Sequence, residues 1–181
     1  MNNISNSLVI ISNGQFQLCN LDQKPVWELG RIAANNIPDI AVNCPTVSRM
    51  HGKFHVMNGY WFYVDNTGTN GTVYNGKKVR NGYGGRKKPV MLEHGDVLVL
   101  GGSSEKFALE NTVYILYTNT PWVGNWRVCN TPGLRSIRVA TNSEQFVVSQ
   151  LKLGQVIDTS EGLAIYMGDV TYVSGNVQIF S

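Results

Sequence analysis

Short stretches of alternating apolar and polar residues, separated by Asn-Gly pairs, run along much of the chain. The clearest covers residues 54–64, in which the alternation stops at an Asn-Gly pair (58–59) and then resumes. Both residue types tolerate positive φ, so this pair predicts a tight β-hairpin turn between two strands. The same pair recurs at 75–76 and 81–82, and the apolar residues 97–100 follow Gly-Asp as a further predicted strand.

Strand patterns continue to the end of the chain, and no helical periodicity persists for more than about ten residues. The predicted later strands are 113–117, 136–139, 145–148, 163–167 and 177–180. Many short strands with frequent turns indicate an all-β fold, a sandwich or barrel. We expect one domain over residues 8–110. Residues 111–181 add further β-strands, either packed on that domain or forming a small second one.

Composition narrows the classes of protein without identifying one. Apolar residues make up 43% of the chain, which is enough for a packed core, and the net charge of +3 is too small to indicate bulk binding of nucleic acid. Cys19, Cys44 and Cys129 form neither a disulfide framework nor a metal-ligand pattern, so we expect no metal and no cofactor. No stretch approaches the ~20 apolar residues of a membrane span, and we expect a soluble, cytoplasmic protein.

Residues suited to binding a phosphate monoester stand beside the predicted strand ends. Such an ester carries about −1.5 to −2 charges and three strong acceptor oxygens, which guanidinium and small hydroxyl groups bind well. Arg31, Ser48, Arg49 and Thr69 supply these groups. Asn70 differs, because its amide both donates and accepts and can hold a peptide main chain. Loops at one end of a sandwich converge, so these residues can meet.

Four motifs in this order resemble the signature of the forkhead-associated (FHA) domain. They are Gly30-Arg31, Ser-Arg-Met-His at 48–51, Thr-Asn-Gly-Thr-Val-Tyr-Asn-Gly at 69–76, and Gly-Asp-Val-Leu-Val-Leu-Gly at 95–101. Each is weak alone, but together, at family-like spacings, they are specific. The resemblance covers about residues 8–110. It implies a β-sandwich of about eleven strands that recognises phosphothreonine peptides through loops at one end and discriminates against phosphoserine.

The resemblance also assigns roles to individual residues. It implies that Arg31, Ser48 and Thr69 are phosphate ligands, that Arg49 is a variable phosphate or peptide contact, and that Asn70 binds the peptide backbone.

Other residues are expected to support the site or to tune it. By the same resemblance His51 braces its loop, and Gly30 and Gly71 are structural supports. One departure is Gly68, which stands where the family usually has a serine hydroxyl that braces the loop. Residues that could select the peptide are Thr46, Lys77, Lys78, Arg80 and Arg86.

The sequence leaves three functional classes to consider. The first is a phosphothreonine-reading interaction module without catalytic activity, whose partner is made by a Ser/Thr kinase. The second is a scaffold or assembly module of a larger signalling or secretion protein, bacterial by family analogy, that binds independently of phosphorylation. The third is an enzyme, which we reject because no nucleophile elbow, paired carboxylates or metal cluster is evident. The basic residues around 77–88 lack interleaved aromatics apart from Tyr83, so we expect no nucleic-acid partner.

Overall fold

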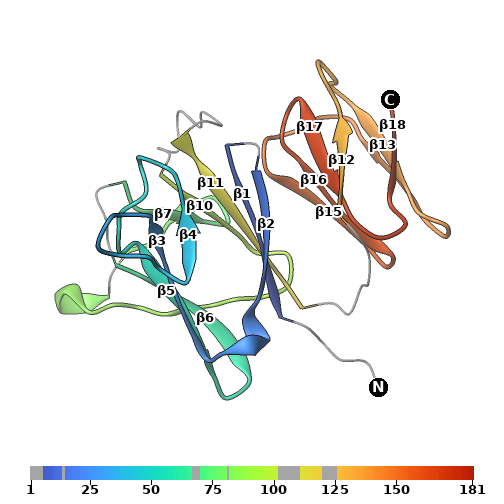
Figure 1. Ribbon diagram of the computed structural model, residues 1–181. Coiled ribbons are helices and arrows are strands. Elements are labelled where there is room, and N and C mark those ends of the chain that lie inside the picture. Colours follow the sequence, from blue (N-terminus) through green and yellow to red (C-terminus); the bar gives the residue numbers. More distant parts are fainter. Residues whose placement is uncertain (1–5, 14, 67–69, 81, 102–110, 120–125) are drawn as a thin grey trace. The chain divides into compact units, whose positions relative to one another are not determined.

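The protein is built almost entirely of β-strands (Figure 1). The structure, a computed structural model, describes residues 6–13, 15–66, 70–80, 82–101, 111–119 and 126–181. The chain divides into two compact units, Met1–Thr120 and Pro121–Ser181. The predicted all-β fold is confirmed. In the described part of the chain, no helix combines the length and the apolar character needed to cross a membrane.

The first unit is a sandwich of two sheets. In order across the first sheet, the strands are β2 (Gln15–Asn20), β1 (Ser7–Ser12), β11 (Val113–Thr118), β10 (Val97–Leu100), β7 (Thr72–Tyr74) and β8 (Lys77–Lys78). The second sheet contains β4 (Ile40–Val42), β3 (Val26–Arg31), β5 (Gly52–Met57), β6 (Tyr60–Asp65) and β9 (Val90–Met91). Two short 3₁₀ segments, η1 (Leu21–Gln23) and η2 (Tyr83–Gly85), lie in the connections. The described residues of the first unit thus form eleven strands, the number that the resemblance implied.

Two of the three predicted Asn-Gly hairpins are present. Asn58 (φ 52°) and Gly59 (φ 81°) join β5 to β6, and Asn75 (φ 46°) and Gly76 (φ 83°) join β7 to β8. Positive φ at both central residues is what a type I′ turn requires, so the local sequence determines both turns. The third pair includes residue 81, which lies outside the described residues.

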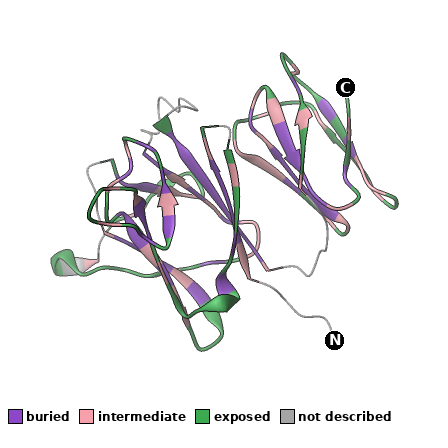
Figure 2. Cartoon of the chain, viewed as in Figure 1, coloured by how far each residue is buried: buried purple, intermediate pink, exposed green. Residues whose placement is uncertain are grey.

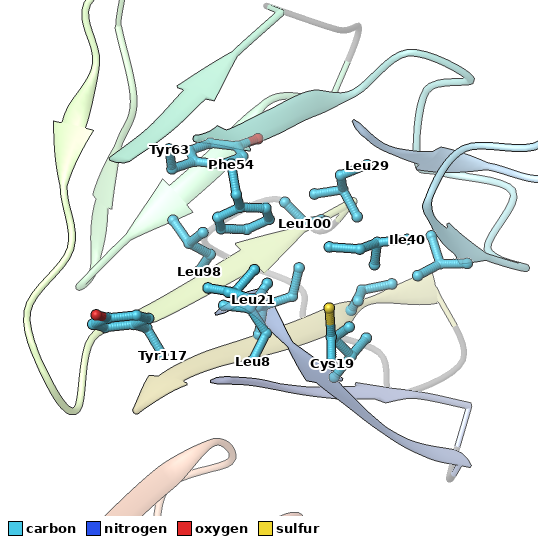
Figure 3. Packing of buried hydrophobic residues seen from close by; sticks show 14 of the residues in the cluster. Leu8, Cys19, Leu21, Leu29, Ile40, Phe54, Tyr63, Leu98, Leu100 and Tyr117 are labelled. Atoms are coloured by element: carbon cyan, nitrogen blue, oxygen red, sulfur yellow. The ribbon is translucent and has the colours of Figure 1, made fainter. Parts of the chain in front are cut away.

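The core of the first unit lies between its two sheets (Figures 2 and 3). Leu8 and Leu98 come from the first sheet, and Leu29, Phe54 and Tyr63 from the second. The rings of Phe54 and Tyr63 pack at a tilt with centroids 5.1 Å apart. Each large apolar side chain buried in this way contributes roughly 1.5–3 kcal/mol before the entropic cost of ordering the chain, so this layer holds the sheets together.

The first unit extends beyond the expected limit of residue 110. Strand β11 pairs with β1 on one side and with β10 on the other, so it lies inside the first sheet. Its residues Val113, Ile115 and Tyr117 belong to the core between the sheets, as their alternation predicts. The division therefore falls at Thr120–Pro121, because β11 completes the sandwich rather than beginning the second unit.

The second unit has its own sheets and its own core. One sheet orders β12 (Arg127–Asn130), β17 (Val170–Val173), β16 (Gly162–Tyr166) and β15 (Gln155–Thr159), and the other orders β14 (Gln145–Val148), β13 (Ile137–Ala140) and β18 (Gln178–Phe180). Buried side chains from both sheets, including Ile137, Val139 and Val173, form one cluster. The predicted C-terminal strands correspond to β13, β14, β16 and β18, whereas β12, β15 and β17 were not predicted.

Candidate functional site

Strand register brings three chain segments to one end of the second sheet. Leu29, near the end of β3, pairs with Gly52 at the start of β5, and Gly52 pairs with Asp65 at the end of β6. The segments that leave these strands therefore start side by side. They carry the predicted residues at 30–31, 46–51 and 69–71.

Arg31 is held against the loop that carries Ser48. Its backbone N–H donates to the Ser48 carbonyl at 3.0 Å, and its side-chain Nε donates to the Val47 carbonyl at 3.1 Å. Gly30 allows this approach, because a Cβ there would lie only 1.9 Å from the Arg49 carbonyl oxygen. The guanidinium is thus fixed through Nε, and its two terminal nitrogens carry the other four N–H donors.

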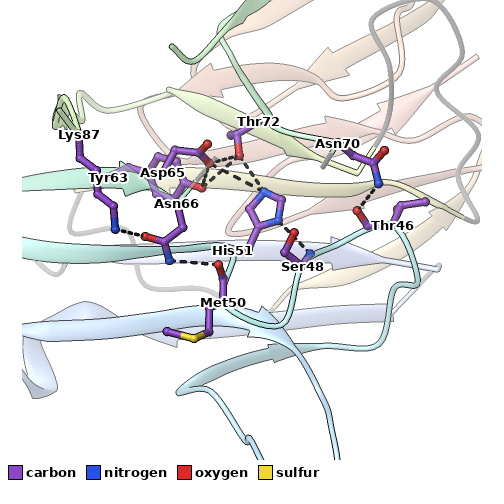
Figure 4. Close-up of polar contacts among 10 residues, drawn as sticks. All are labelled: Thr46, Ser48, Met50, His51, Tyr63, Asp65, Asn66, Asn70, Thr72 and Lys87. Atoms are coloured by element: carbon purple, nitrogen blue, oxygen red, sulfur yellow. Dashed lines mark hydrogen bonds and ion pairs between the residues drawn. The ribbon is translucent and has the colours of Figure 1, made fainter. Parts of the chain in front are cut away.

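His51 is the centre of a buried hydrogen-bond network (Figure 4). Its Nδ1 accepts from the Ser48 backbone N–H at 3.2 Å, and its Nε2 lies 2.9 Å from the Thr72 hydroxyl. The Thr72 and Tyr63 hydroxyls both donate to Asp65 Oδ1, at 2.6 and 2.7 Å. This pattern fits a neutral imidazole protonated on Nε2. His51 therefore ties the Ser48 loop to β7 in the opposite sheet.

Burial sets the charge state of this network. The His51 side chain is fully buried, and desolvation lowers its pKa, although the Asp65 carboxylate 3.9 Å away acts in the opposite direction. Burial also raises the pKa of Tyr63 far above its ordinary value, with the same carboxylate adding to the effect. Both groups are consequently neutral near pH 7 and serve as hydrogen-bond partners.

Asn70 is hydrogen-bonded to the loop that carries Ser48 (Figure 4). Its Nδ2 donates to the Thr46 carbonyl at 2.8 Å, and the Thr46 hydroxyl donates to the Asn111 carbonyl at 2.6 Å. Gly71 follows with φ 68°, a left-handed conformation that glycine adopts without strain. The 70–71 turn is thereby attached to the loop that presents Ser48.

Two asparagines that were not predicted complete the loop contacts. Asn66 donates from Nδ2 to the Met50 carbonyl at 3.1 Å and accepts from the Lys87 ammonium at 2.7 Å. Asn36 donates from Nδ2 to the Arg49 carbonyl at 3.3 Å. Asparagine at a strand end is a common turn residue, so nothing in the sequence singled these two out.

The predicted residues fall into three groups. Hydrogen bonds join the segments that carry five of them: Arg31, Ser48, Arg49, Thr46 and Asn70. The supporting residues Gly30, His51 and Gly71 lie on the same segments. Thr69 and the atypical Gly68 lie outside the described residues. The basic residues Lys77, Lys78, Arg80 and Arg86 are exposed on β8 and the segment that follows it.

Comparisons with known proteins identify a family over part of the chain and structures of similar fold. The FHA domain family model matches residues 27–101. Two structures of the yeast splicing factor Pml1 resemble the chain with TM-scores of 0.50 at 22% identity; they cover 64% and 63% of this chain and 80% and 81% of their own. The first FHA domain of yeast Rad53 matches at a TM-score of 0.48 and 22% identity, covering 65% of this chain and 78% of its own. No curated protein matches.

The first unit is a two-sheet β-sandwich, and the segments around Arg31, Ser48 and Asn70 meet at one end of its second sheet. The FHA family model matches residues 27–101, a stretch within the first unit that reaches from β3 to β10, and we therefore assign this stretch to the FHA domain family.

Proposed function

We propose that the first unit binds phosphothreonine peptides through the loops around Arg31, Ser48 and Asn70. The observation that carries this proposal is the anchoring of Arg31. Its Nε bond to the Val47 carbonyl fixes the guanidinium beside the loop of Ser48 before any ligand arrives. A preorganised donor group loses little conformational freedom on binding, which favours affinity.

The chemistry of these groups suits a doubly charged ester. The terminal nitrogens of Arg31 can bind two phosphate oxygens at once, and the Ser48 hydroxyl can donate to the third. The exposed Arg49 adds charge at the rim. Thr69, the remaining predicted phosphate ligand, belongs to the same proposal through the FHA motif.

Selectivity for phosphothreonine and a role for Asn70 rest on the FHA motif. Asn70 uses one amide N–H to reach Thr46, and an amide nitrogen carries two. We propose that the Asn70 amide holds the peptide main chain next to the phosphothreonine. The kinase that makes such a partner phosphorylates threonine, and we propose a cytoplasmic signalling role on that basis.

The contacts of His51 argue against hydrolysis by Ser48. A serine nucleophile needs a base that accepts its hydroxyl proton. Here His51 Nδ1 accepts from the backbone N–H of Ser48, and Nε2 faces the Thr72 hydroxyl. With both ring nitrogens engaged in this way, we propose that the site binds its ligand and catalyses nothing.

The test is Arg31→Ala with an oriented library of phosphothreonine peptides. Charge-assisted hydrogen bonds contribute roughly 1.5–3 kcal/mol each, so losing one or more should weaken binding by at least about tenfold. Calorimetry on the selected peptides measures this, with Arg138→Ala as the control because Arg138 is an exposed arginine in the second unit. Equal binding by Arg31→Ala, or by the unphosphorylated peptides, would refute the proposal.

The second unit supports an alternative, a phosphorylation-independent assembly contact. It has a separate core and exposes the apolar side chains of Val128 and Val147, with 60% and 75% of their surface accessible. A partner captured by the full chain, and retained after phosphatase treatment and with Arg31→Ala, would favour this function.

A further inference from the structure

The basic segment, residues 77–88 without residue 81, lies next to the candidate site. The segment holds six of the chain's fifteen Lys and Arg residues and no Asp or Glu. All six are exposed: Lys77, Lys78, Arg80, Arg86, Lys87 and Lys88. The net charge of the whole chain is only +3, so this positive charge is concentrated locally rather than spread over the molecule.

Two of these lysines lie beside the two ends of the loop between β6 and β7. A Cβ at Gly71 would be 3.0 Å from Lys78 Cε and 3.8 Å from its Nζ, so the lysine chain extends beside the turn that follows Asn70. At the other end of the loop, the Lys87 ammonium donates to Asn66 (Figure 4). The basic segment therefore touches both ends of the loop that carries the phosphothreonine motif.

The segment also shapes two neighbouring grooves. One, of about 400 Å³, has walls from Tyr74, Val79, Pro89 and Val90, with basic residues including Lys88 among its lining. The other, of about 570 Å³, is lined by Gly82, Gly84 and residues 86–89, and shares Lys88 and Pro89 with the first. A surface with apolar walls and a cationic rim suits a peptide that has both acidic and apolar side chains.

We propose that the partner's phosphothreonine is flanked by an Asp- and Glu-rich segment that binds along the basic segment. This inference rests on the proposed function and specifies the class of peptide. Charge complementarity supports this partner, and the contacts of Lys78 and Lys87 make the basic segment continuous with the candidate site. A nucleic acid is a weaker fit, because Tyr74 directs its hydroxyl to the carboxylate of Asp96, and its ring is partly buried.

The experiment compares three pools of phosphothreonine peptides whose flanks are fixed as Glu, Ala or Lys. The variant is the full chain with Lys78→Glu and Lys88→Glu. The matched control is Arg138→Glu with Lys152→Glu, which reverses two exposed basic residues of the second unit. Fluorescence anisotropy at low and high salt measures affinity. We expect the parent chain to bind the Glu-flanked pool roughly 3- to 10-fold more tightly than the Ala-flanked pool at low salt, with the gain reduced at high salt.

Charge reversal separates electrostatics from damage to the fold. The double variant should lose the preference for Glu flanks and gain affinity for Lys flanks, whereas a misfolded protein would lose affinity for every pool. The readout is the ratio of the affinities for the Glu-flanked and Ala-flanked pools, because Lys78→Glu beside Gly71 also repels the phosphate that all three pools share. The control variant should leave this ratio unchanged.

The possible negative results distinguish the inference about acidic flanks from the proposed phosphopeptide binding itself. Equal affinity of the parent chain for all three phosphorylated pools would overturn the inference and leave the proposed function intact. Glu-flanked peptides that bind equally well without phosphate would overturn both. Displacement of the Glu-flanked pool by a single-stranded oligonucleotide at lower concentration than by an acidic peptide would overturn the inference in favour of a nucleic-acid surface.

Discussion

The hydrogen that serves as the side chain of Gly30 lets the 48–51 loop lie against β3. An alanine Cβ there would be 1.9 Å from the Arg49 carbonyl oxygen, and that neighbour is backbone rather than a flexible side chain. We expect Gly30→Ala to destabilise the first unit by about 1–3 kcal/mol and to weaken phosphopeptide binding, because the loop must move. Urea denaturation and calorimetry measure the two effects.

The control for this substitution is Gly82→Ala. Gly82 has an ordinary φ, and its added Cβ would meet nothing closer than the Arg86 carbonyl at 3.4 Å. We expect a change of less than about 0.5 kcal/mol. If both alanine variants were equally stable, the close contact at Gly30 would have no energetic importance.

His51 should make the stability of the first unit depend on pH. Its folded pKa lies below the ordinary value because burial disfavours the charged form. The unfolded chain therefore binds the proton more readily, so this contribution is complete above about pH 6.5 and is lost as the pH falls toward the folded pKa. His55 has a pKa lowered by burial and by Lys53, and it adds to the same slope.

His51→Gln isolates the share of this residue. We expect the variant to be less stable near pH 7.5, because the bonds to Ser48 and Thr72 are disturbed at a cost of roughly 1–3 kcal/mol. The difference from the parent chain should narrow by about pH 5, since only the parent still has to resist protonation of His51. Urea titrations at both pH values give the comparison, and a difference that is independent of pH would contradict the buried, neutral state.

Sequence patterns predicted candidate ligands, but they did not predict the hydrogen bonds and contacts that hold those residues in position. Arg31, Ser48 and Asn70 were predicted because guanidinium, hydroxyl and amide groups have recognisable chemistry beside a strand end. The contact of Asn66 with Lys87 and the packing of Lys78 beside Gly71 were not predicted. These contacts join residues that only the folded sandwich brings together, and no local pattern encodes them.

At the scale of elements, the two Asn-Gly turns differ in what the asparagine does. Asn75 donates from Nδ2 to Asp96 at 2.9 Å and accepts the Val97 N–H at 3.0 Å, so its side chain connects β7 to β10. Asn58 lies at an exposed hairpin tip between β5 and β6. Both residues have positive φ, which glycine also adopts.

Asn→Gly substitutions should therefore separate conformation from bonding. We expect Asn75→Gly to cost about 1–3 kcal/mol, because the buried Asp96 carboxylate and the Val97 N–H lose a partner. Asn58→Gly keeps the turn and should cost less than about 0.5 kcal/mol. Thermal or urea unfolding of both variants provides the measurement. Equal losses would mean that Asn75 acts only through its backbone conformation.

The hairpins were predictable because turn chemistry and alternation are both local signals. The parallel pairing of β3 with β4, in which Leu29 pairs with Ile40 and Arg31 with Val42, was not. Its connecting segment has neither helix periodicity nor a tight-turn motif, and β4 has only three residues. Likewise the alternation in 113–117 predicted a strand, but a pattern of period two does not state which sheet the strand joins.

At the scale of the whole molecule, the position of β11 decides which fragment can fold. A chain ending at residue 110 lacks Val113–Thr118, so β1 and β10 lose the strand that lies between them. It also lacks Val113, Ile115 and Tyr117 from the core. A chain ending at Thr120 retains every strand of both sheets of the first unit.

We expect residues 1–120 to unfold cooperatively and to bind the selected phosphopeptides within about twofold of the full chain, because every loop of the candidate site belongs to this unit. Residues 1–110 should show no cooperative transition, since three buried side chains at roughly 1.5–3 kcal/mol each amount to much of the stability of a domain this size. Circular dichroism during heating and calorimetry compare the two fragments. Cooperative unfolding and full binding by residues 1–110 would show that β11 is dispensable and would return the boundary to the sequence-based position. Loss of binding by a well-folded 1–120 fragment would instead require the second unit to take part in recognising the peptide.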